Sequence, residues 1–502
     1  MTVLTTERRL GPGPVMRTGS VAAYRGVAEI GGEPHVVRTD ITRTQDVSMA
    51  KAIACLVHFT DLHVTDAESP ARFEFVNRYW QDPRFRELLT MQRPQELLNT
   101  HAIAAIVRAI NGLNAGPVTR SPVGMAVMTG DAVDNTQRNE LLNYLALLGG
   151  GTVSPDTGAA GYDGVQCAEW PDDMYWKPDG PPDGDIFQRA LGYPSHPGLL
   201  ADAVVPFQSE GLRIPWLGCY GNHEQVCQGV GIVTRELAAR MTGSLKPVGP
   251  PSGLNPERVV EDFTDHPELF MTGESVEVPP DPGRRPISRE EFVDLHVQAG
   301  GHGFTDRSYY AHDAGGVRFV TLDTVCDAGG ADGSIDAEQL HWLERRLEEV
   351  HSTFRSRDGS VIRTGNRDRY VVVLSHHGYA NLSNPRGEKR ADELLRLLGR
   401  FGNVVLWLNG HTHTNRIVAR DGFWEVTTGS IVDWPRQARV VELYETAGGA
   451  LAIGCTMVDH DGEGLAGLHR ELAANVPSRG FDDGSDGRPE DRNAILLLRK
   501  PF

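Results

Sequence analysis

The sequence has few cysteines and lacks the segments that membranes and export require. Its six cysteines lie far apart and form no CxxC pair, which excludes a zinc ribbon and a dense disulfide framework. No run approaches about 18 consecutive apolar residues, so no membrane span is expected. Arg8 and Arg9 precede Gly-Pro-Gly-Pro at residues 11–14 instead of an apolar signal core. We therefore expect a cytoplasmic protein with reduced thiols or, as the alternative, a mature exported form whose signal is absent from this chain.

Positive charge is also scarce. Asp and Glu number 67 against 49 Lys and Arg, which gives a formal net charge of −18. Such a surface repels polyanions, and no basic groove interleaved with aromatic residues is apparent, so a nuclease acting on long nucleic acid is disfavoured. A small phosphorylated substrate remains compatible, because bound metal ions would reverse the sign of the field locally. The oligomeric state is left open.

Short apolar runs alternate with helical patterns along the chain, which predicts an α/β fold with buried sheets. The predicted strands include residues 53–57, 126–128, 214–219, 318–322, 370–374 and 404–408. The predicted helices include residues 96–110, 137–148, 337–350 and 391–401. Three consecutive strands are expected beyond His413, at residues 416–419, 423–427 and 439–444.

Two long stretches interrupt this alternation. The stretch from about residue 149 to 211 is rich in Gly, Pro and Asp, and the stretch from about 229 to 303 contains proline-rich segments. Loops of this length inside a compact domain are usually functional or disordered, and we expect both insertions to form a cap that limits substrate size. The expected domains are an N-terminal extension (1–48), a catalytic domain (49–445) and a C-terminal β/helical extension (446–502).

Five of the predicted strands are each followed by carboxylate, amide or imidazole side chains. In chain order these are Asp61 and His63, then Asp131, Asn222, His376, and finally His411 and His413. Open α/β sheets place their ligand sites at such strand ends. In an extended chain, residues i and i+2 point the same way, so each closely spaced pair is predicted to face one cavity.

These side chains form a metal-ligating set without thiolate. Carboxylate, amide and imidazole ligands suit Mn, Fe or Zn and disfavour a structural cysteine-zinc site. Seven candidate ligands are too many for one ion. We therefore expect two divalent or trivalent ions about 3.5–4 Å apart, bridged by a shared carboxylate.

The ordered motifs Asp-x-His, Gly-Asp-x-x-Asp-Asn, Gly-Asn-His-Glu, His-His and Gly-His-x-His resemble those of the calcineurin-like metallophosphoesterase superfamily. The resemblance covers about residues 53–435. The wide motif separation is similar to that of a bacterial subfamily with long inserts, whose members often carry a twin-arginine export signal. The resemblance implies an αββα sandwich of four layers, in which helices flank two mixed β-sheets and the metals lie at one edge.

The resemblance also implies a role for each motif residue. Asp61, His63 and His413 would hold the first metal, Asn222, His376 and His411 the second, and Asp131 would bridge both. His223 would stabilise the phosphate or protonate the leaving oxygen, and Asp134 would orient its ring. A water or hydroxide shared by the ions would attack phosphorus in line.

Four further residues are candidates for second-shell or substrate contacts. His377 is the alternative to His376 as a ligand, or a residue that orients one. Asn135 stands where related protein phosphatases carry an arginine, which weakens a protein phosphatase interpretation. Asn415 and His302 are candidates to face the substrate, with strand-start and loop packing as the alternatives.

The motifs leave several functions open. The missing arginine and the motif order favour a small phosphodiester or nucleotide as the substrate. The alternatives are a phosphomonoesterase or nucleotidase of the same fold and, in a different class, a non-catalytic metal-binding scaffold. The scaffold hypothesis predicts a lost ligand or a lost His223 equivalent, and neither is lost in this sequence.

Overall fold

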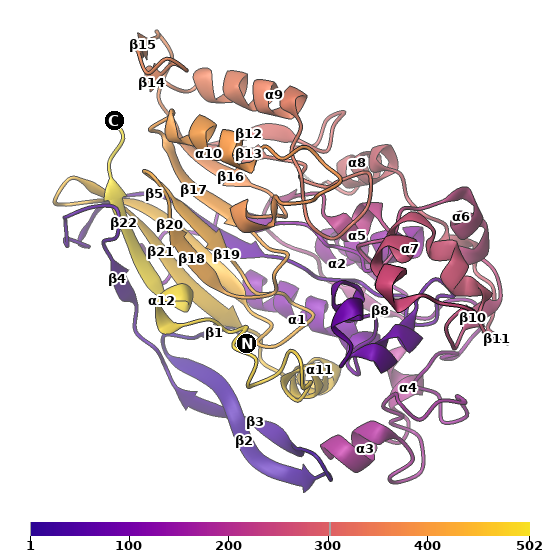
Figure 1. Cartoon of the computed structure of the whole chain (residues 1–502). Helices are drawn as coiled ribbons and strands as arrows, with labels where there is room; N and C mark the ends of the chain where they lie inside the picture. The colour runs from indigo at the N-terminus through magenta and orange to yellow at the C-terminus, as the bar shows by residue number, and fades with distance from the viewer. Residues whose placement is uncertain (1, 301–302) are drawn as a thin grey trace.

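The chain folds around two mixed β-sheets that are packed together (Figure 1). The computed structural model describes residues 2–300 and 303–502. Within these residues, the first sheet has eight strands in the order β4-β22-β21-β20-β5-β6-β9, with β1 paired to β21. The second sheet has six strands in the order β12-β13-β16-β17-β19-β18. Each sheet contains both parallel and antiparallel pairs, as predicted.

The first sheet draws its strands from both ends and the middle of the chain. They are β1 (Val3–Leu4), β4 (Val36–Arg38), β5 (Met49–Phe59), β6 (Met125–Met128), β9 (Trp216–Gly218), β20 (Ala438–Thr446), β21 (Ala450–Asp459) and β22 (Ala494–Arg499). The strands β5, β6 and β9 run parallel, so their carboxyl ends meet at one edge. The stretches 1–48 and 446–502 thus both supply strands to this sheet, while the domain boundaries stay predictions.

The second sheet is built from the later part of the catalytic region. Its strands are β12 (Tyr310–Ala314), β13 (Val317–Thr321), β16 (Tyr370–Leu374), β17 (Val404–Asn409), β18 (Arg416–Ala419) and β19 (Trp424–Thr427). The strands β13, β16, β17 and β19 are parallel neighbours. The carboxyl ends of β16 and β17 therefore also lie at one edge.

Strand β16 shows why its sequence is apolar throughout. Val372 and Leu374 belong to the core between the sheets, whereas Val371 and Val373 pack into a second core under helices. Because successive side chains of a strand point to opposite faces, a strand covered on both faces is hydrophobic at every position. Burial of both faces explains why apolar and polar residues do not alternate along β16.

Helices cover the outer face of each sheet (Figure 1). The helices α1 (Asn99–Asn111), α2 (Arg138–Gly149) and α11 (Gly464–Ala474) lie on the side of the first sheet. The helices α9 (Ala337–Glu348) and α10 (Ala391–Gly399) cover the second sheet. Asp336 begins α9 by accepting a hydrogen bond from the backbone N–H of Gln339. The predicted four-layer α/β sandwich is thus confirmed.

The insertions fold into small satellite units. Residues 149–211 contain the hairpin β7 (Gly151–Val153) and β8 (Phe207–Ser209), with α3 (Ile186–Leu191) and α4 (Leu199–Ala203) between them. Their aromatic side chains, including Trp176 and Tyr193, form a local core with Tyr24.

The second insertion is also largely structured. It holds α6 (Arg235–Met241), β10 (Leu245–Pro247), α7 (Val259–Asp265), β11 (Ser275–Glu277) and α8 (Arg289–Gln298). Its apolar residues share a core with residues 71–91, including Phe73 and Phe263. The 3₁₀ helices η1 (Glu74–Tyr79) and η2 (Pro83–Leu88) therefore pack against this insertion, whereas Leu97 and Leu98 of η3 (Glu96–Leu98) join the core of the first insertion.

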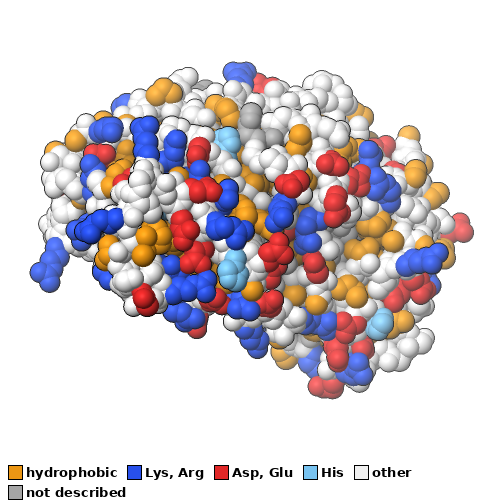
Figure 2. Space-filling view, turned by 90° about the horizontal axis from the view of Figure 1, so that it is seen from above, with side chains coloured by type: hydrophobic (Ala, Val, Ile, Leu, Met, Phe, Trp, Pro, Cys, Tyr) orange, Lys and Arg blue, Asp and Glu red, His pale blue; other side chains and the backbone are white. Residues whose placement is uncertain are grey.

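The remaining elements are short or peripheral. They are the ribbon of β2 (Arg8–Thr18) and β3 (Ala23–Gly31), the hairpin of β14 (Thr353–Arg355) and β15 (Val361–Arg363), and the short helices α5 (Asn222–Gln225) and α12 (Pro489–Arg492). None of the helices in the described ranges is long and apolar enough to span a membrane. Lys and Arg side chains are interspersed with Asp and Glu on the face shown in Figure 2.

A buried histidine on α8 predicts acid sensitivity. His296 is fully buried against Phe292 and Phe304, and burial lowers the pKa of His296 to about 4. The unfolded chain therefore binds a proton more readily, and stability that is present above pH 6.5 is lost as the pH falls towards 4. The free energy of unfolding of the wild type should fall between pH 7.5 and pH 5 by about 2 kcal/mol more than that of His296→Phe, because the variant has no imidazole to protonate on unfolding.

Denaturant unfolding at the two pH values measures this effect. His341→Phe is the matched control, because His341 also bonds the carbonyl four residues earlier, on α9, but is exposed. An equal response of both variants to pH would show that the burial of His296 does not cause the sensitivity.

Candidate metal centre

The seven candidate ligands lie together at the edge where strands of both sheets end. Asp61 and His63 follow β5, Asp131 follows β6 and Asn222 follows β9. His376 follows β16, and His411 and His413 follow β17. Six of the seven are buried, and the side chain of His411 is 13% exposed. The register of the parallel strands therefore brings together residues that are up to 352 positions apart in the chain (413 − 61).

The backbone at most of these positions is left-handed. The φ angles are 51° at Asp61, 46° at His63, 53° at Asp131, 69° at His411 and 55° at His413. A residue with a Cβ pays roughly 1–2 kcal/mol for this conformation, which clusters at functional sites. The prediction that each i, i+2 pair lies in extended chain was wrong, because the chain turns sharply where the strand ends. The side chains of each pair nevertheless reach one cluster.

Asp61, His63 and His413 form the first group of donors. Nε2 of His413 lies 3.3 Å from Oδ1 of Asp61 and 3.2 Å from Nε2 of His63. Their ligand atoms all lie within 4.8 Å of one another, as a shared ion requires. Burial raises the pKa of Asp61, but the neighbouring His413 outweighs it and holds that pKa at about 2. The carboxylate is therefore ionised, as a metal ligand must be.

Asp131, Asn222, His376 and His411 form the second group. Nε2 of His376 lies 3.1 Å from Oδ2 of Asp131 and 3.3 Å from Nδ1 of His411. The amide of Asn222 donates from Nδ2 to the carbonyl of Gly229, and its buried Oδ1 has no partner among the described residues. An unsatisfied buried oxygen costs free energy, and a cation would satisfy it.

Asp131 faces both groups. Its Oδ2 lies 3.7 Å from Nε2 of His63 in the first group, as well as 3.1 Å from His376 in the second. Burial opposes ionisation, but His376 and His223 hold the pKa of Asp131 well below its usual range. In turn, the carboxylate overcomes the burial of His376 and raises the pKa of that imidazole to about 9. A cation between the two side chains is therefore electrostatically favoured.

Oxygen atoms behind the histidines determine which ring nitrogen is free. Nδ1 of His63 lies 3.2 Å from Asp134, Nδ1 of His376 lies 2.9 Å from the carbonyl of Thr129, and Nδ1 of His413 lies 2.7 Å from Asp433. Each Nδ1–H donates to its oxygen, so each Nε2 of the neutral imidazole presents a lone pair to the centre, and at His376 a bound cation would displace the proton that Asp131 favours. This is the arrangement of metal-binding histidines.

The hydrogen bonds of His376 and His377 distinguish these neighbours. His377 lies near His376 and His411, within a group of potential ligands. However, its Nδ1 is 2.9 Å from the hydroxyl of Thr324, and its Nε2 is 2.9 Å from the carbonyl of Ala331. Both of its nitrogens are engaged, whereas Nε2 of His376 faces Asp131. The geometry therefore favours His376 as the ligand.

His223 lies beside the donors and lines a pocket that opens over them. Its ring packs edge-on against His63, with 4.4 Å between centroids. Its Nδ1 bonds the backbone carbonyl of Asp134, and its Nε2 lies 4.0 Å from Oδ2 of Asp131. The carboxylate of Asp134 contacts His63, Arg72 and Gln228 instead. The expectation was that the carboxylate of Asp134 orients His223. The backbone carbonyl of Asp134 holds His223 instead.

Asn135 and Asn415 do not line the pocket over the donors. The amide of Asn135 is buried between Gln228 N–H and the carbonyl of Ala71. The amide of Asn415 accepts from Gly429 N–H and from Arg439. His302 lies outside the described residues. Asn135 and Asn415 thus hold loops together, which is a structural role.

A pocket of about 340 Å³ opens over the donors. Its wall comes from residues 87–90 at the end of η2, with Arg93, residues 228–230, Ala331, Asn381 and Arg479. The insertion at 149–211 contributes none of the lining residues, and the insertion at 229–303 contributes Gly229 and Val230. The prediction that both insertions cap this edge was therefore wrong. The segment between β5 and α1, which was not identified as an insertion, forms much of the cap.

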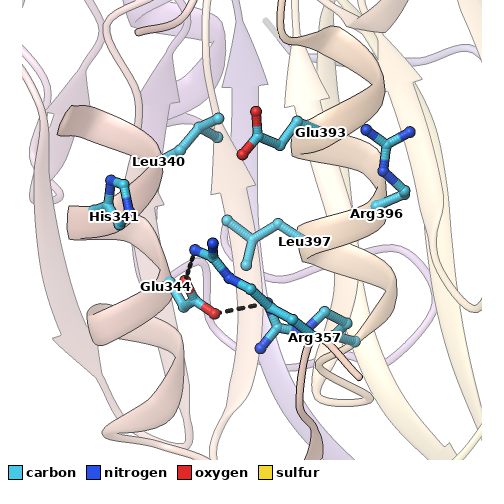
Figure 3. A pocket seen from close by; sticks show the side chains of 8 residues that line it. Leu340, His341, Glu344, Arg357, Glu393, Arg396 and Leu397 are labelled. Carbon is cyan, nitrogen blue, oxygen red and sulfur yellow. Dashed lines mark hydrogen bonds and ion pairs between the residues drawn. The ribbon is translucent and has the colours of Figure 1, made fainter. Parts of the chain in front are cut away.

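A second hollow, of about 270 Å³, lies between α9 and α10 (Figure 3). Its carboxylate Glu344 is bound by Arg357 and Arg400. None of the motif residues lines it. This hollow therefore offers no free metal donor set.

Asp433 is a partner of His413 that the motifs do not indicate. Asp433 is 1% exposed, bonds Nδ1 of His413 and accepts at 2.8 Å from Nε of Arg93. Asp433 lies 20 positions after His413 and outside the motifs, so no spacing within the motifs indicates this contact. Removal of such a partner typically weakens metal binding 10–100-fold.

We expect Asp433→Asn to lower the affinity for Mn²⁺ about 10–100-fold, because the imidazole of His413 loses the carboxylate that holds it. Titration calorimetry of the metal-free protein measures this affinity. Asp482→Asn, at an exposed aspartate in the C-terminal segment, is the control and is expected to bind as the wild type does. Unchanged affinity in Asp433→Asn would contradict the positioning role.

A comparison with protein families supports this fold. Residues 182–415 match the family model of the calcineurin-like phosphoesterases. The match spans the third, fourth and fifth motifs, and β5 and β6 carry the first two to the same edge. The chain thus has a calcineurin-like phosphoesterase domain, and the family resemblance is confirmed. The match to this family supports metal-dependent hydrolysis of phosphoesters as the reaction class, with a binuclear metal centre.

Solved structures of low sequence identity are similar to this one. A dimetal phosphatase from Danio rerio has 11% identity over 81% of this chain and 96% of its own, with a TM-score of 0.36. GAP50, the anchor in the inner membrane complex of Plasmodium, has 10% identity over 85% and 98%, with a TM-score of 0.29. A phosphopantetheinyl hydrolase from Mycobacterium tuberculosis has 12% identity over 76% and 90%, with a TM-score of 0.23. No curated protein matched the sequence significantly.

Proposed function

We propose that the protein hydrolyses a small phosphodiester with two metal ions. Asp61, His63 and His413 would hold the first ion, Asn222, His376 and His411 the second, and Asp131 would contact both. The observation that carries this proposal is the convergence of seven donors whose free atoms point to one centre. The orphaned Oδ1 of Asn222 and the opposed nitrogens of His63 and His413, 3.2 Å apart, fit bound cations.

Two ions bound in this centre would supply Lewis acidity, which activates water and neutralises the phosphoryl oxygens. The left-handed backbone and the oxygen partners of the histidines hold the donors in place before any ligand arrives. Such preorganisation lowers the cost of reorganising polar groups during the reaction. Mn, Fe and Zn all suit this donor set.

His223 would act on the phosphate or on the leaving oxygen. Because its Nδ1–H donates to the carbonyl of Asp134, its Nε2 is the nitrogen available to the pocket. A protonated Nε2 would donate to a phosphoryl oxygen or transfer its proton to the leaving alkoxide. Asp134 would assist indirectly, through its peptide carbonyl.

Two observations bear on the ester type. The amide of Asn135 is turned away from the pocket, so no guanidinium is supplied from the position that carries arginine in protein phosphatases. A phosphodiester carries one negative charge and a monoester two, so the absence of a guanidinium at this position favours the diester, whereas Arg93 and Arg479 bring guanidiniums to the pocket from other segments. The pocket of about 340 Å³ favours a small substrate, and its size also suits a phosphomonoester as the second candidate.

Hydrolysis of bis(p-nitrophenyl) phosphate and p-nitrophenyl phosphate in the presence of Mn²⁺ tests the proposal. We expect both to be cleaved, with the higher kcat/KM for the diester. A clear monoester preference would reverse the ranking. Metal binding without cleavage of either compound would instead support the scaffold hypothesis, which the presence of every donor and of His223 disfavours. A cytoplasmic location and the absence of long nucleic acid substrates stay predictions.

A further inference from the structure

Two arginines reach the pocket from outside the metal motifs. Arg93 lies between η2 and η3, and Arg479 lies in the segment after α11. They are the Lys or Arg side chains among the residues that line the pocket in the described ranges. Neither is needed to build the sheets, so their position at the centre requires a separate explanation.

Arg93 is anchored through Nε, and the two terminal amino groups of its guanidinium make no hydrogen bond among the described residues. The residue is 9% exposed, and its Nε donates to Asp433 at 2.8 Å. Asp433 also accepts from His413, so this arginine is anchored beside the first group of donors. The guanidinium offers five N–H groups in a planar fork. With Nε engaged, the two terminal amino groups remain for a ligand.

Arg479 is held less tightly and has no carboxylate within ion-pair distance among the described residues. Among the described residues, its side chain makes one hydrogen bond, from Nη1 to the carbonyl oxygen of Thr412 at 3.3 Å. Thr412 lies between His411 and His413, so the guanidinium is placed over the loop that carries two donors. The positive charge of Arg93 is balanced by Asp433, whereas that of Arg479 is not balanced by a direct partner.

The pocket has no platform for a nucleobase. Apart from the histidines already described, its lining residues in the described part of the chain include no aromatic side chain. Base stacking relies chiefly on Phe, Tyr or Trp, and the described lining offers only Leu88 and Leu89 as large apolar side chains, besides the histidines of the centre and the two guanidiniums. The lining thus favours a compact aliphatic group over a nucleoside.

We propose that Arg479, supported by Arg93, binds a second anionic group on a small aliphatic phosphoester. This inference rests on the proposed function and names its substrate class. The metals and His223 would face the scissile phosphate, so the guanidinium of Arg479, which has no salt-bridge partner among the described residues, is available to another anion. A carboxylate or a second phosphate matches the planar fork of a guanidinium. These two arginines therefore select the substrate without taking part in bond cleavage.

Matched substrate pairs test this selection. For diesters, the pair is p-nitrophenyl 2-carboxyethyl phosphate and its neutral 2-carbamoylethyl analogue. For monoesters, it is 2-phosphoglycolate and 2-phosphoglycolamide, and the pair used is the ester type that the wild type cleaves faster. We expect kcat/KM of the wild type to be about 10- to 100-fold higher for the anionic member. Ethane-1,2-diol bisphosphate then distinguishes a phosphate from a carboxylate as the preferred second group.

Substitution of Arg479 assigns the effect to this residue. We expect Arg479→Ala to lose the preference through a higher KM for the anionic member, while hydrolysis of the neutral member changes less than about threefold. Arg479→Lys keeps the charge and is expected to restore part of the preference. Arg488→Ala, at a largely exposed arginine nearby in the chain, is the matched control and should keep the full preference.

The outcomes separate this inference from the proposed function. A wild-type protein that cleaves neither pair would overturn the proposed function. Cleavage of both members at equal kcat/KM, or an equal loss for both members in Arg479→Ala, would overturn the second anionic site and leave the hydrolase intact. The equal loss would place Arg479 on the scissile phosphate instead.

Discussion

Asp131→Asn is expected to lower kcat/KM for phosphoester hydrolysis by about a thousandfold or more and to reduce the number of Mn²⁺ ions bound per chain. Asp131 is the carboxylate that approaches both His63 and His376. An amide keeps its shape but removes the negative charge shared between the proposed ions. Loss of metal stabilisation worth several kcal/mol corresponds to a rate loss of this size.

Asparagine suits this position conformationally, which makes the substitution selective for charge. The φ angle of Asp131 is 53°, and Asn tolerates the left-handed region better than most residues do. The control is Asp183→Asn, since Asp183 also has a left-handed backbone, with φ of 59°, but lies on the surface. Metal analysis and steady-state kinetics are the measurements. Two ions bound and full activity in Asp131→Asn would contradict the proposed bridge.

His223→Asn is expected to lower kcat about 100- to 10,000-fold for a substrate with an alkyl leaving group, while the bound metal stays unchanged. An asparagine amide can still donate to the carbonyl of Asp134, as Nδ1 of His223 does. The substitution therefore removes chiefly the nitrogen that faces the pocket. With p-nitrophenolate, which leaves without a proton, we expect a loss of about tenfold or less.

The comparison between leaving groups identifies the role. Equal losses for alkyl and p-nitrophenyl esters would mean that His223 stabilises the phosphate and does not protonate the leaving oxygen. Loss of bound metal together with activity would mean that His223 acts by positioning the donors. Its Nε2 lies 4.0 Å from Oδ2 of Asp131, so such an effect would run through this carboxylate. His341→Asn, at an exposed histidine of α9, is the control for a general effect of removing an imidazole.

The order of the metal motifs could be predicted because each is a local pattern. A buried strand is apolar at every position, and a polar pair directly after it lies at the carboxyl edge of the sheet. The strands β16 and β17, followed by His376 and by His411 with His413, show this pattern clearly. The backbone of these pairs could not be predicted, since a left-handed turn after a strand preserves the same spacing as an extended one.

The cap was assigned to the wrong segments for a physical reason. Long Gly- and Pro-rich stretches were interpreted as a lid, but the aromatic residues of 149–211 find apolar partners in α11 and in Tyr24, away from the centre. Residues 87–93 cover the pocket instead, because residues 71–91 pack against the second insertion. Such packing depends on which apolar surfaces meet, and composition does not determine that.

The sequence by itself determined the α/β class and the order of the candidate donors along the strands, because these depend on residue type and short-range spacing. Only the tertiary structure decided which nitrogen of His376, His63 and His413 is free, since the oxygens of Thr129, Asp134 and Asp433 lie 247, 71 and 20 positions from the histidine that each contacts. It likewise decided that Arg93, 340 residues from Asp433, and Arg479 reach the pocket. Contacts of this range arise from the packing of two sheets and their caps, which local sequence patterns do not encode.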